Sequence, residues 1–242
     1  MIVSINQPAY LPWLGYFERI AASDLHIVLD HVQFEKNSFT NRNKARTKEG
    51  STWLTIPLAT KGRFGDLAIN TLDFAANDPW QKKHWATLRM NYARAPFFKE
   101  YAPAYEALYA QAWTGFMPMA RAFLAQHLRD LGIATPLLFS SEMQVEGTKS
   151  ELVLNLCRTA GADTYLSGAL GRNYLDEATF TQAGVAVRYQ DCAHPTYAQC
   201  QPGFEPYMGV LDLIFNHGPA SREILLGNVN QTAAALATAG AS

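Results

Sequence analysis

The chain opens with apolar and amphipathic segments that alternate. Residues 2–5 (IVSI) are an apolar run typical of a buried strand, and residues 17–24 (FERIAASD) have the pattern of a short helix. Residues 25–34 (LHIVLDHVQF) are rich in apolar and β-branched residues, which predicts a second strand. A strand, a helix and a strand in this order predict a βαβ unit, and therefore a parallel sheet.

The middle of the chain changes character. A polar, turn-rich stretch follows the second predicted strand, and STWLTIPLA (51–59) then has the composition of a further strand. Residues 78–131 have a helical pattern almost throughout, with helices expected over 78–93, 101–112 and 116–131. We expect this region to be either a helical insertion or one helical layer.

The second half returns to alternating strands and helices. Strands are predicted at PLLFSSEM, DTYLSGAL and VAVRYQD, and helices at KSELVLNLCRTAGA, EATFTQAG and VLDLIFNHG. The fold class predicted is therefore α/β, with a parallel-sheet, Rossmann-like core built from residues 1–77 and 132–218. Residues 219–242 are expected to form a C-terminal helix or tail.

Composition narrows the functional classes. The chain has 242 residues, of which 48% are hydrophobic and 17% charged, and its net charge is −1. This balance is that of a globular protein, and the absence of a basic stripe argues against a nucleic-acid partner. We find no signal peptide and no charge-free apolar window long enough for membrane insertion. The three cysteines suggest reduced thiols, so a cytoplasmic location is expected. The oligomeric state is left open.

An aromatic, proline-rich turn follows the first predicted strand. INQPAYLPWLGYFERI (5–20) places Gln7, Tyr10, Trp13 and Tyr16 around two prolines and a glycine. Ligands of open α/β sheets bind beyond the carboxyl ends of the strands. We therefore expect these four side chains to line a substrate site.

A dense group of polar residues follows the second predicted strand. Its members are Asp30, Gln33, Lys36, Asn41, Arg42 and Asn43. In one interpretation they form Asx-turns and solvated charges. In the other, Lys36 and Arg42 hold a phosphate or carboxylate of the substrate.

A glycine-containing loop follows the strand DTYLSGAL. The candidate binding residues in it are Ser167, Gly168, Gly171, Arg172, Asn173 and Tyr174. Backbone amides in such loops can hold an anion. The loop matches neither a dinucleotide-binding nor a P-loop motif, and an ordinary β-to-α turn explains it equally well.

Histidine and cysteine supply the candidates for chemistry. His194 follows the strand VAVRYQD with Asp191 three residues before it, so the pair is a candidate for a general base and the carboxylate that holds it. His84 faces either the site or solvent. A thiol enzyme using Cys157 or Cys192 with His194 is an alternative. No His or Cys pair has the spacing of a zinc site, so no metal is predicted.

Several blocks taken together resemble a known family. INQPAYLPWLGYFERI, DHVQFEKNSFTNRNK, WLTIPL, KSELVLNLCRTAGADTYLSGALGRNYLD and DCAHPTYAQ…FEPYMGVLDLIFNHG are similar to the WbqC-like protein family, from residue 5 to about residue 218. Resemblance to this family implies a role in making bacterial surface polysaccharides or specialised metabolites. Where the family pattern leads us to expect an Asp pair, this sequence has Asp30 and His31.

The first strand and turn also resemble the start of a HUP-type nucleotide-binding domain. Pro8 or Pro12 and Gly15 are the counterparts of the motif's proline and glycine, but its histidines are absent. The usual adenylyl transfer is therefore not expected, although a nucleotide could stack on the aromatic residues.

Two functional hypotheses follow. The first is an acyl or aminoacyl transferase, or amide ligase, acting on an amine such as a nucleotide-linked amino sugar, with a nucleotide or acyl donor as co-substrate. The second is a non-catalytic protein that binds a nucleotide sugar for a partner. In the first, His194 takes the proton of the amine.

Overall fold

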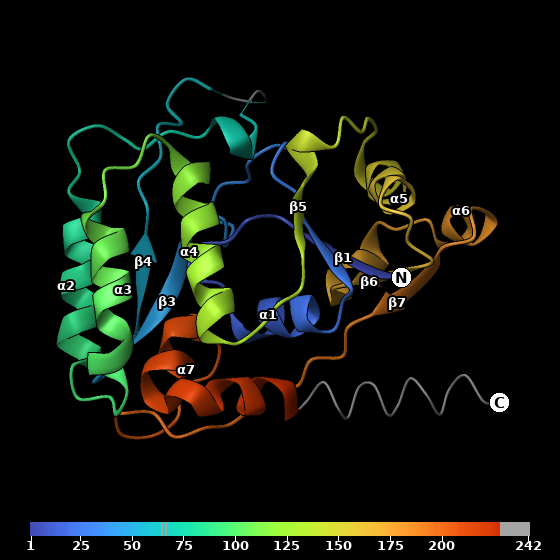
Figure 1. Cartoon of the computed structure of the whole chain (residues 1–242). Coiled ribbons are helices and arrows are strands. Elements are labelled where there is room, and N and C mark those ends of the chain that lie inside the picture. Colours follow the sequence, from blue (N-terminus) through green and yellow to red (C-terminus); the bar gives the residue numbers. More distant parts are fainter. Residues whose placement is uncertain (64, 66, 228–242) are drawn as a thin grey trace.

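Five parallel strands form the central sheet, in the order β5-β2-β1-β6-β7 (Figure 1). The strands are β1 (Ile2–Asn6), β2 (Leu25–Val28), β5 (Leu137–Phe139), β6 (Thr164–Ser167) and β7 (Ala186–Tyr189). The computed structural model describes residues 1–63, 65 and 67–227. The predicted α/β fold with a Rossmann-like parallel core is confirmed.

Alternating side chains of β1 serve the two faces of the sheet. Val3 and Ile5 pack in a cluster with α5 (Lys149–Thr159) and α6 (Glu177–Gln182). On the other face Ser4 hydrogen-bonds His26 of β2 at 2.8 Å, both fully buried, and α1 (Leu14–Ala21) contacts β1. Helices on both faces explain why the inner strands β1, β2 and β6 are buried almost throughout.

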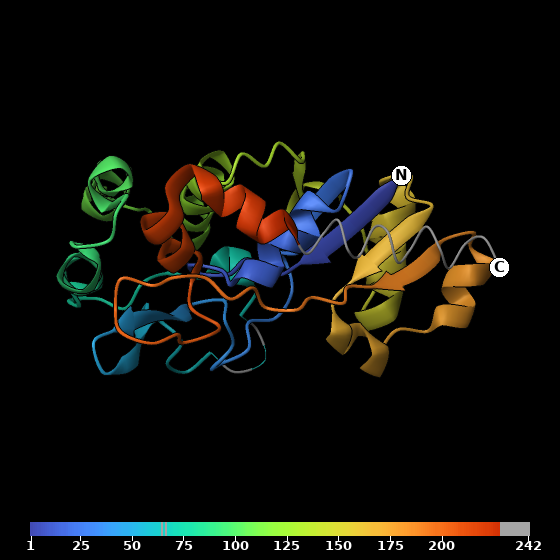
Figure 2. The same cartoon turned by 90° about the horizontal axis from the view of Figure 1, so that it is seen from below.

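A second, larger core lies beside the sheet. It joins α1 to α2 (Trp80–Tyr92), α3 (Phe98–Ala110), α4 (Phe116–Asp130) and α7 (Val210–His217). α2 and α3 stand at one end of the molecule, while α5 and α6 stand at the other (Figures 1 and 2). The structure thus has three helices where the sequence predicts them within 78–131.

The polar stretch after β2 contains a strand that the sequence pattern does not reveal. β3 (Arg42–Thr47) pairs antiparallel with β4 (Gly50–Thr55), and this hairpin is separate from the main sheet. Its RNKART sequence looks like a loop, yet Asn43, Ala45 and Arg46 are buried. The second strand was also predicted too long, because β2 ends at Val28 rather than at residue 34.

Residues 190–209 connect β7 to α7 and run from the edge of the sheet to the hairpin (Figure 2). Short 3₁₀ helices occur at η1 (Ile69–Thr71), η2 (Ser140–Glu142), η3 (Ala169–Asn173) and η4 (Gly218–Ala220).

Residues 221–227 of the expected C-terminal helix or tail are helical, and 228–242 lie outside the described residues. Among the described helices, none is both long and apolar enough to cross a membrane.

Candidate functional site

A cavity of about 600 Å³ opens at the carboxyl ends of β1, β6 and β7. From β1 the chain continues to β2 on one side, whereas β6 and β7 lie on the other, so β1 and β6 form the switch point of the sheet. Open α/β sheets bind ligands at this position. The lining residues are Ile5, Asn6, Trp13, Gly15, Arg19, Phe39, Tyr165, Ser167, Gly168, Ala169, Leu170, Gly171, Tyr174, Gln190, Asp191, Cys192, His194 and Tyr207.

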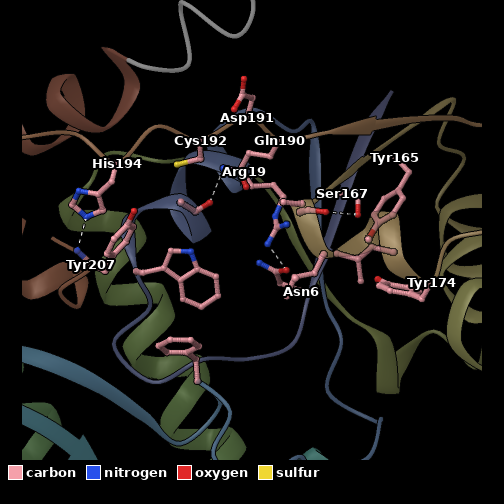
Figure 3. A pocket seen from close by; sticks show the side chains of 18 residues that line it. Asn6, Arg19, Tyr165, Ser167, Tyr174, Gln190, Asp191, Cys192, His194 and Tyr207 are labelled. Atoms are coloured by element: carbon pink, nitrogen blue, oxygen red, sulfur yellow. Dashed lines mark hydrogen bonds between the residues drawn. The ribbon is translucent and has the colours of Figure 1, made fainter.

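Arg19 and Asn6 lie in the middle of this cavity (Figure 3). Arg19 is on the same face of α1 as Gly15, one helical turn earlier, and it donates a hydrogen bond from Nη2 to the Asn6 side-chain oxygen. Its Nη1 lies against Gly168, where a Cβ atom would come within 2.1 Å. A glycine after β6 therefore lets the guanidinium approach the backbone.

Aromatic side chains form one wall. The rings of Trp13 and Phe39 are 5.2 Å apart, and Trp13 makes an isolated antiparallel bridge with Gly209. Figure 3 shows His194 and Tyr207 on one side of the cavity and Tyr165, Ser167 and Tyr174 on the other. A ligand in the cavity therefore meets ring faces as well as polar groups, as is common in small-molecule sites.

The segment after β7 closes the cavity over α1. Gln190 donates from Nε2 to the Gly15 carbonyl at 2.8 Å. Burial raises the pKa of the Glu18 carboxyl, while hydrogen bonds from Cys192 and Gln190 act in the opposite direction. Burial, followed by the hydrogen bond to Glu18, raises the pKa of the Cys192 thiol to about 12. A thiol held in this way is protonated at neutral pH and is a poor nucleophile.

His194 is held by main-chain groups. Its Nδ1 donates to the Pro195 carbonyl at 2.8 Å, and its Nε2 accepts from the Tyr207 amide at 3.1 Å. Burial lowers its pKa, so the imidazole is neutral at pH 7. Asp191 lines the same cavity, but no hydrogen bond joins it to His194 in the described part of the chain.

Several predicted site residues lie outside this cavity, in the cores. The Tyr10 hydroxyl hydrogen-bonds His84 Nδ1 at 2.9 Å and also Tyr109, all three buried. Burial lowers the pKa of His84 to about 4 and raises the pKa of Tyr16 well above its usual value. Gln7 is partly buried and is not among the lining residues.

Asp30 and Gln33 connect the loop after β2 to neighbouring segments. The Asp30 carboxylate, 1% exposed, accepts hydrogen bonds from the Ser141 amide at 2.9 Å, the Ser141 hydroxyl at 2.8 Å and the Ser140 hydroxyl at 3.1 Å. Gln33 accepts from the Leu67 amide at 3.0 Å. These contacts give both side chains a structural role that polar composition alone does not distinguish from binding.

The remaining polar residues of this group lie at the hairpin. Lys36, Asn41 and Arg42 line a second, smaller cavity of about 280 Å³. Asn43 is buried and donates to the Leu11 carbonyl. The Arg42 guanidinium also lies 4.5 Å from the ring centre of Trp53.

The predicted site residues in the loop after β6 fall into two groups. Ser167, Gly168, Gly171 and Tyr174 line the main cavity, whereas Arg172 and Asn173 are exposed and not among its lining residues. The Arg172 guanidinium instead lies 3.9 Å from the ring centre of Tyr189.

Sequence reasoning missed several lining residues, chiefly Asn6, Arg19, Phe39, Gln190 and Tyr207. A charged pair, Glu18 and Arg19, on a helix that directly follows the aromatic turn was the available signal for Arg19. The predicted thiol Cys157 is on α5 and faces the core, where burial raises its pKa to about 12. The described residues contain no group of three or more His, Cys, Asp or Glu arranged for a metal.

Comparison with known proteins agrees with the sequence resemblance. The model of the WbqC-like protein family matches residues 7–224. A Mycobacterium tuberculosis protein, itself named as uncharacterized, is 36% identical over 225 residues, which cover 92% of this chain and 96% of that protein. No solved structure matches. The chain belongs to the WbqC-like protein family.

Proposed function

We propose that the protein is a transferase or ligase that forms an amide, moving an acyl or aminoacyl group onto the amine of a small molecule such as a nucleotide-linked amino sugar. The observation that carries this proposal is the cavity of about 600 Å³ at the switch point of the sheet, lined by aromatic rings, a guanidinium and a histidine. Its volume is within the range of small-molecule sites. The resemblance to the family supports a role in polysaccharide or specialised-metabolite biosynthesis.

His194 is the proposed base. The bond from Nδ1 to the Pro195 carbonyl fixes the tautomer, because a carbonyl can only accept, and Nε2 is therefore unprotonated. Its lone pair accepts the Tyr207 amide in this structure. The Tyr207 side chain is 64% exposed, and its backbone has a φ of +62°. An incoming amine that displaces this amide meets a neutral imidazole nitrogen.

The proposed reaction uses an activated acyl donor, such as a thioester or an acyl phosphate. The amine nitrogen forms a bond to the carbonyl carbon, and the bond from that carbon to the leaving group breaks with its electron pair. The proton of the amine passes to Nε2 of His194 and then to the leaving group. Trp13 and Phe39 would hold a ring of the acceptor.

The test begins with a thermal-shift screen of nucleotide-linked amino sugars, acyl-CoA, amino acids and ATP, alone and in pairs. A ligand at about 100 times its Kd should stabilise the protein by roughly 2.7 kcal/mol. Mass spectrometry then detects the amide product. His194→Ala is expected to lower kcat by roughly 100-fold or more, since general bases contribute this much. His217→Ala, which removes a partly exposed histidine that hydrogen-bonds the Ala198 carbonyl and does not line the main cavity, is the matched control and should not change kcat. Unchanged turnover in the His194 variant would exclude it as the base.

Two observations favour a second function, in which the protein binds a nucleotide sugar without turnover. The Nε2 atom of His194 is already occupied by the Tyr207 amide, and the Cys192 thiol is protonated. In that case a nucleotide-linked amino sugar binds tightly and stays intact during long incubation with every acyl donor.

A further inference from the structure

Arg19 is a buried cation with few partners. It is 5% exposed, and the one hydrogen bond that its guanidinium makes within the described residues goes to the uncharged side-chain amide of Asn6. No ion pair involves it in the same part of the chain. Burial lowers the pKa of its guanidinium, which reflects the cost of keeping this charge away from water.

Arg46 provides a comparison within the same chain. It is also 5% exposed, but its guanidinium donates to Gln199 at 3.2 Å and to the carbonyls of Thr47, Gly50 and Pro202 at 2.6–2.7 Å. A guanidinium has five N–H donors, and Arg46 uses most of its own. The two arginines are equally buried, but the guanidinium of Arg19 makes fewer hydrogen bonds than that of Arg46. Of the two, Arg19 is the one that lines the main cavity.

Two buried donors beside each other have no partner. They are Nε of Arg19 and the side-chain Nδ2 of Asn6. Unpartnered buried donors are rare and costly, and one explanation for them is a missing bound group. The two side chains are joined by their own hydrogen bond, and both residues line the main cavity.

The first βα turn cannot offer its backbone as a Rossmann phosphate loop does. Pro8 and Pro12 lack N–H groups, and the turn has no glycine-rich sequence before Gly15. Instead the Arg19 side chain, from α1, lies near the switch point, where backbone amides usually hold an anion.

We infer that Arg19 and Asn6 bind an anionic oxygen group of the ligand, a phosphate or a carboxylate, in the main cavity. This inference rests on the proposed function in taking that cavity as the substrate site, but it concerns binding alone. The anion supplies the acceptors that Arg19 and Asn6 lack, and it neutralises the buried charge. The Trp13 and Phe39 rings then lie along the rest of the same ligand.

The experiment measures equilibrium binding without any acyl donor, by ligand-observed NMR titration. Two matched pairs of probes separate the possible sources of the anion: UDP against uridine for phosphate, and galacturonate against galactose for carboxylate. The wild-type protein is expected to bind the charged member of one pair at least tenfold more tightly than its neutral counterpart. In Arg19→Met this preference should be lost, with affinity lower by roughly 10- to 100-fold.

A thermal-stability measurement separates binding from a structural role. Arg19→Met is expected to melt at the same temperature as wild type or higher, because it removes an unpaired buried charge. Arg46→Met, the matched control, should melt lower because it removes satisfied hydrogen bonds, while its preference for the charged probe is retained.

Three results would overturn the inference: equal affinity of Arg19→Met and wild type for the preferred anion, a lower melting temperature of Arg19→Met with intact binding, or no preference of the wild type for either charged probe. The amide-forming assay is independent of these outcomes. Anion binding through Arg19 without any amide product would leave this inference standing and refute the proposed reaction.

Discussion

Replacing Asp30 by alanine should destabilise the protein without affecting the main cavity. The carboxylate is 1% exposed and joins the end of β2 to η2 through Ser140 and Ser141, with three hydrogen bonds of 2.8–3.1 Å. The Arg121 guanidinium lies 3.7 Å from the Asp30 carboxylate and is partly exposed, so this ion pair adds little to the stability of the fold. Asp30 is therefore a link between two segments far apart in the sequence.

The expected loss follows from these contacts. A hydrogen bond to a charged group contributes about 1.5–3 kcal/mol, and the three here are not additive because they share one carboxylate. The serine hydroxyls can rotate to other acceptors, whereas the Ser141 amide is left without one. We expect Asp30→Ala to lower the free energy of unfolding by about 3–5 kcal/mol. For a chain of this size that corresponds to a decrease in Tm of roughly 6–20 °C.

The assay is urea denaturation followed by circular dichroism, together with titration of the cavity ligand. Asp73→Ala, which removes an exposed carboxylate outside the main cavity, is the control and should change the free energy of unfolding by about 0.5 kcal/mol or less. A similarly small change in Asp30→Ala would refute the structural role. Intact stability with lost ligand binding would instead favour the role in substrate binding that the sequence suggests.

Three further predictions concern two buried histidines, Gly168 and Cys192. Burial lowers the pKa of His26 and of His127 to about 3, so below pH 6.5 the unfolded chain binds two protons that the folded chain does not. Stability should therefore fall as the pH falls from 6 to 4, with these two histidines contributing up to about 2.7 kcal/mol per pH unit, and His26→Gln should flatten the slope of unfolding free energy against pH. Gly168→Ala should displace the Arg19 guanidinium, since its Cβ would come within 2.1 Å of Nη1, and UDP titration of a still-folded variant should show weaker binding. Cys192, with its pKa of about 12, should react with iodoacetamide far more slowly at pH 8 than a free thiol does; fast labelling at neutral pH would revive the thiol-enzyme hypothesis.

The predictable part of the fold is the part with a clear hydrophobic period. β1, β6 and the helices within 78–131 follow from apolar runs and helical spacing. β3 does not, because its buried positions are filled by Asn43 and Arg46, whose hydrogen bonds are made to segments distant in the sequence. A polar side chain is stable in the interior only where other groups satisfy its hydrogen bonds. The sequence does not show which groups those are.

The same reasoning explains the partial success at the site. The sequence places Trp13, Ser167, Gly168 and His194 after strands of one parallel sheet, and strand order brings them to one cavity. It cannot distinguish Tyr10 from Trp13, because their environments depend on α2 and on the loop around Phe39. For Arg19 the sequence offers only its position beside Glu18 after the aromatic turn, and its charge becomes informative once its burial and the single hydrogen bond of its guanidinium are known.

The most direct test of the account is a crystal structure of the protein with a bound nucleotide-linked amino sugar. The account predicts electron density in the main cavity, with an anionic group of the ligand at Arg19 and a ring against Trp13. Ligand bound instead in the smaller cavity lined by Lys36, Asn41 and Arg42 would contradict it, and would place the site at the hairpin.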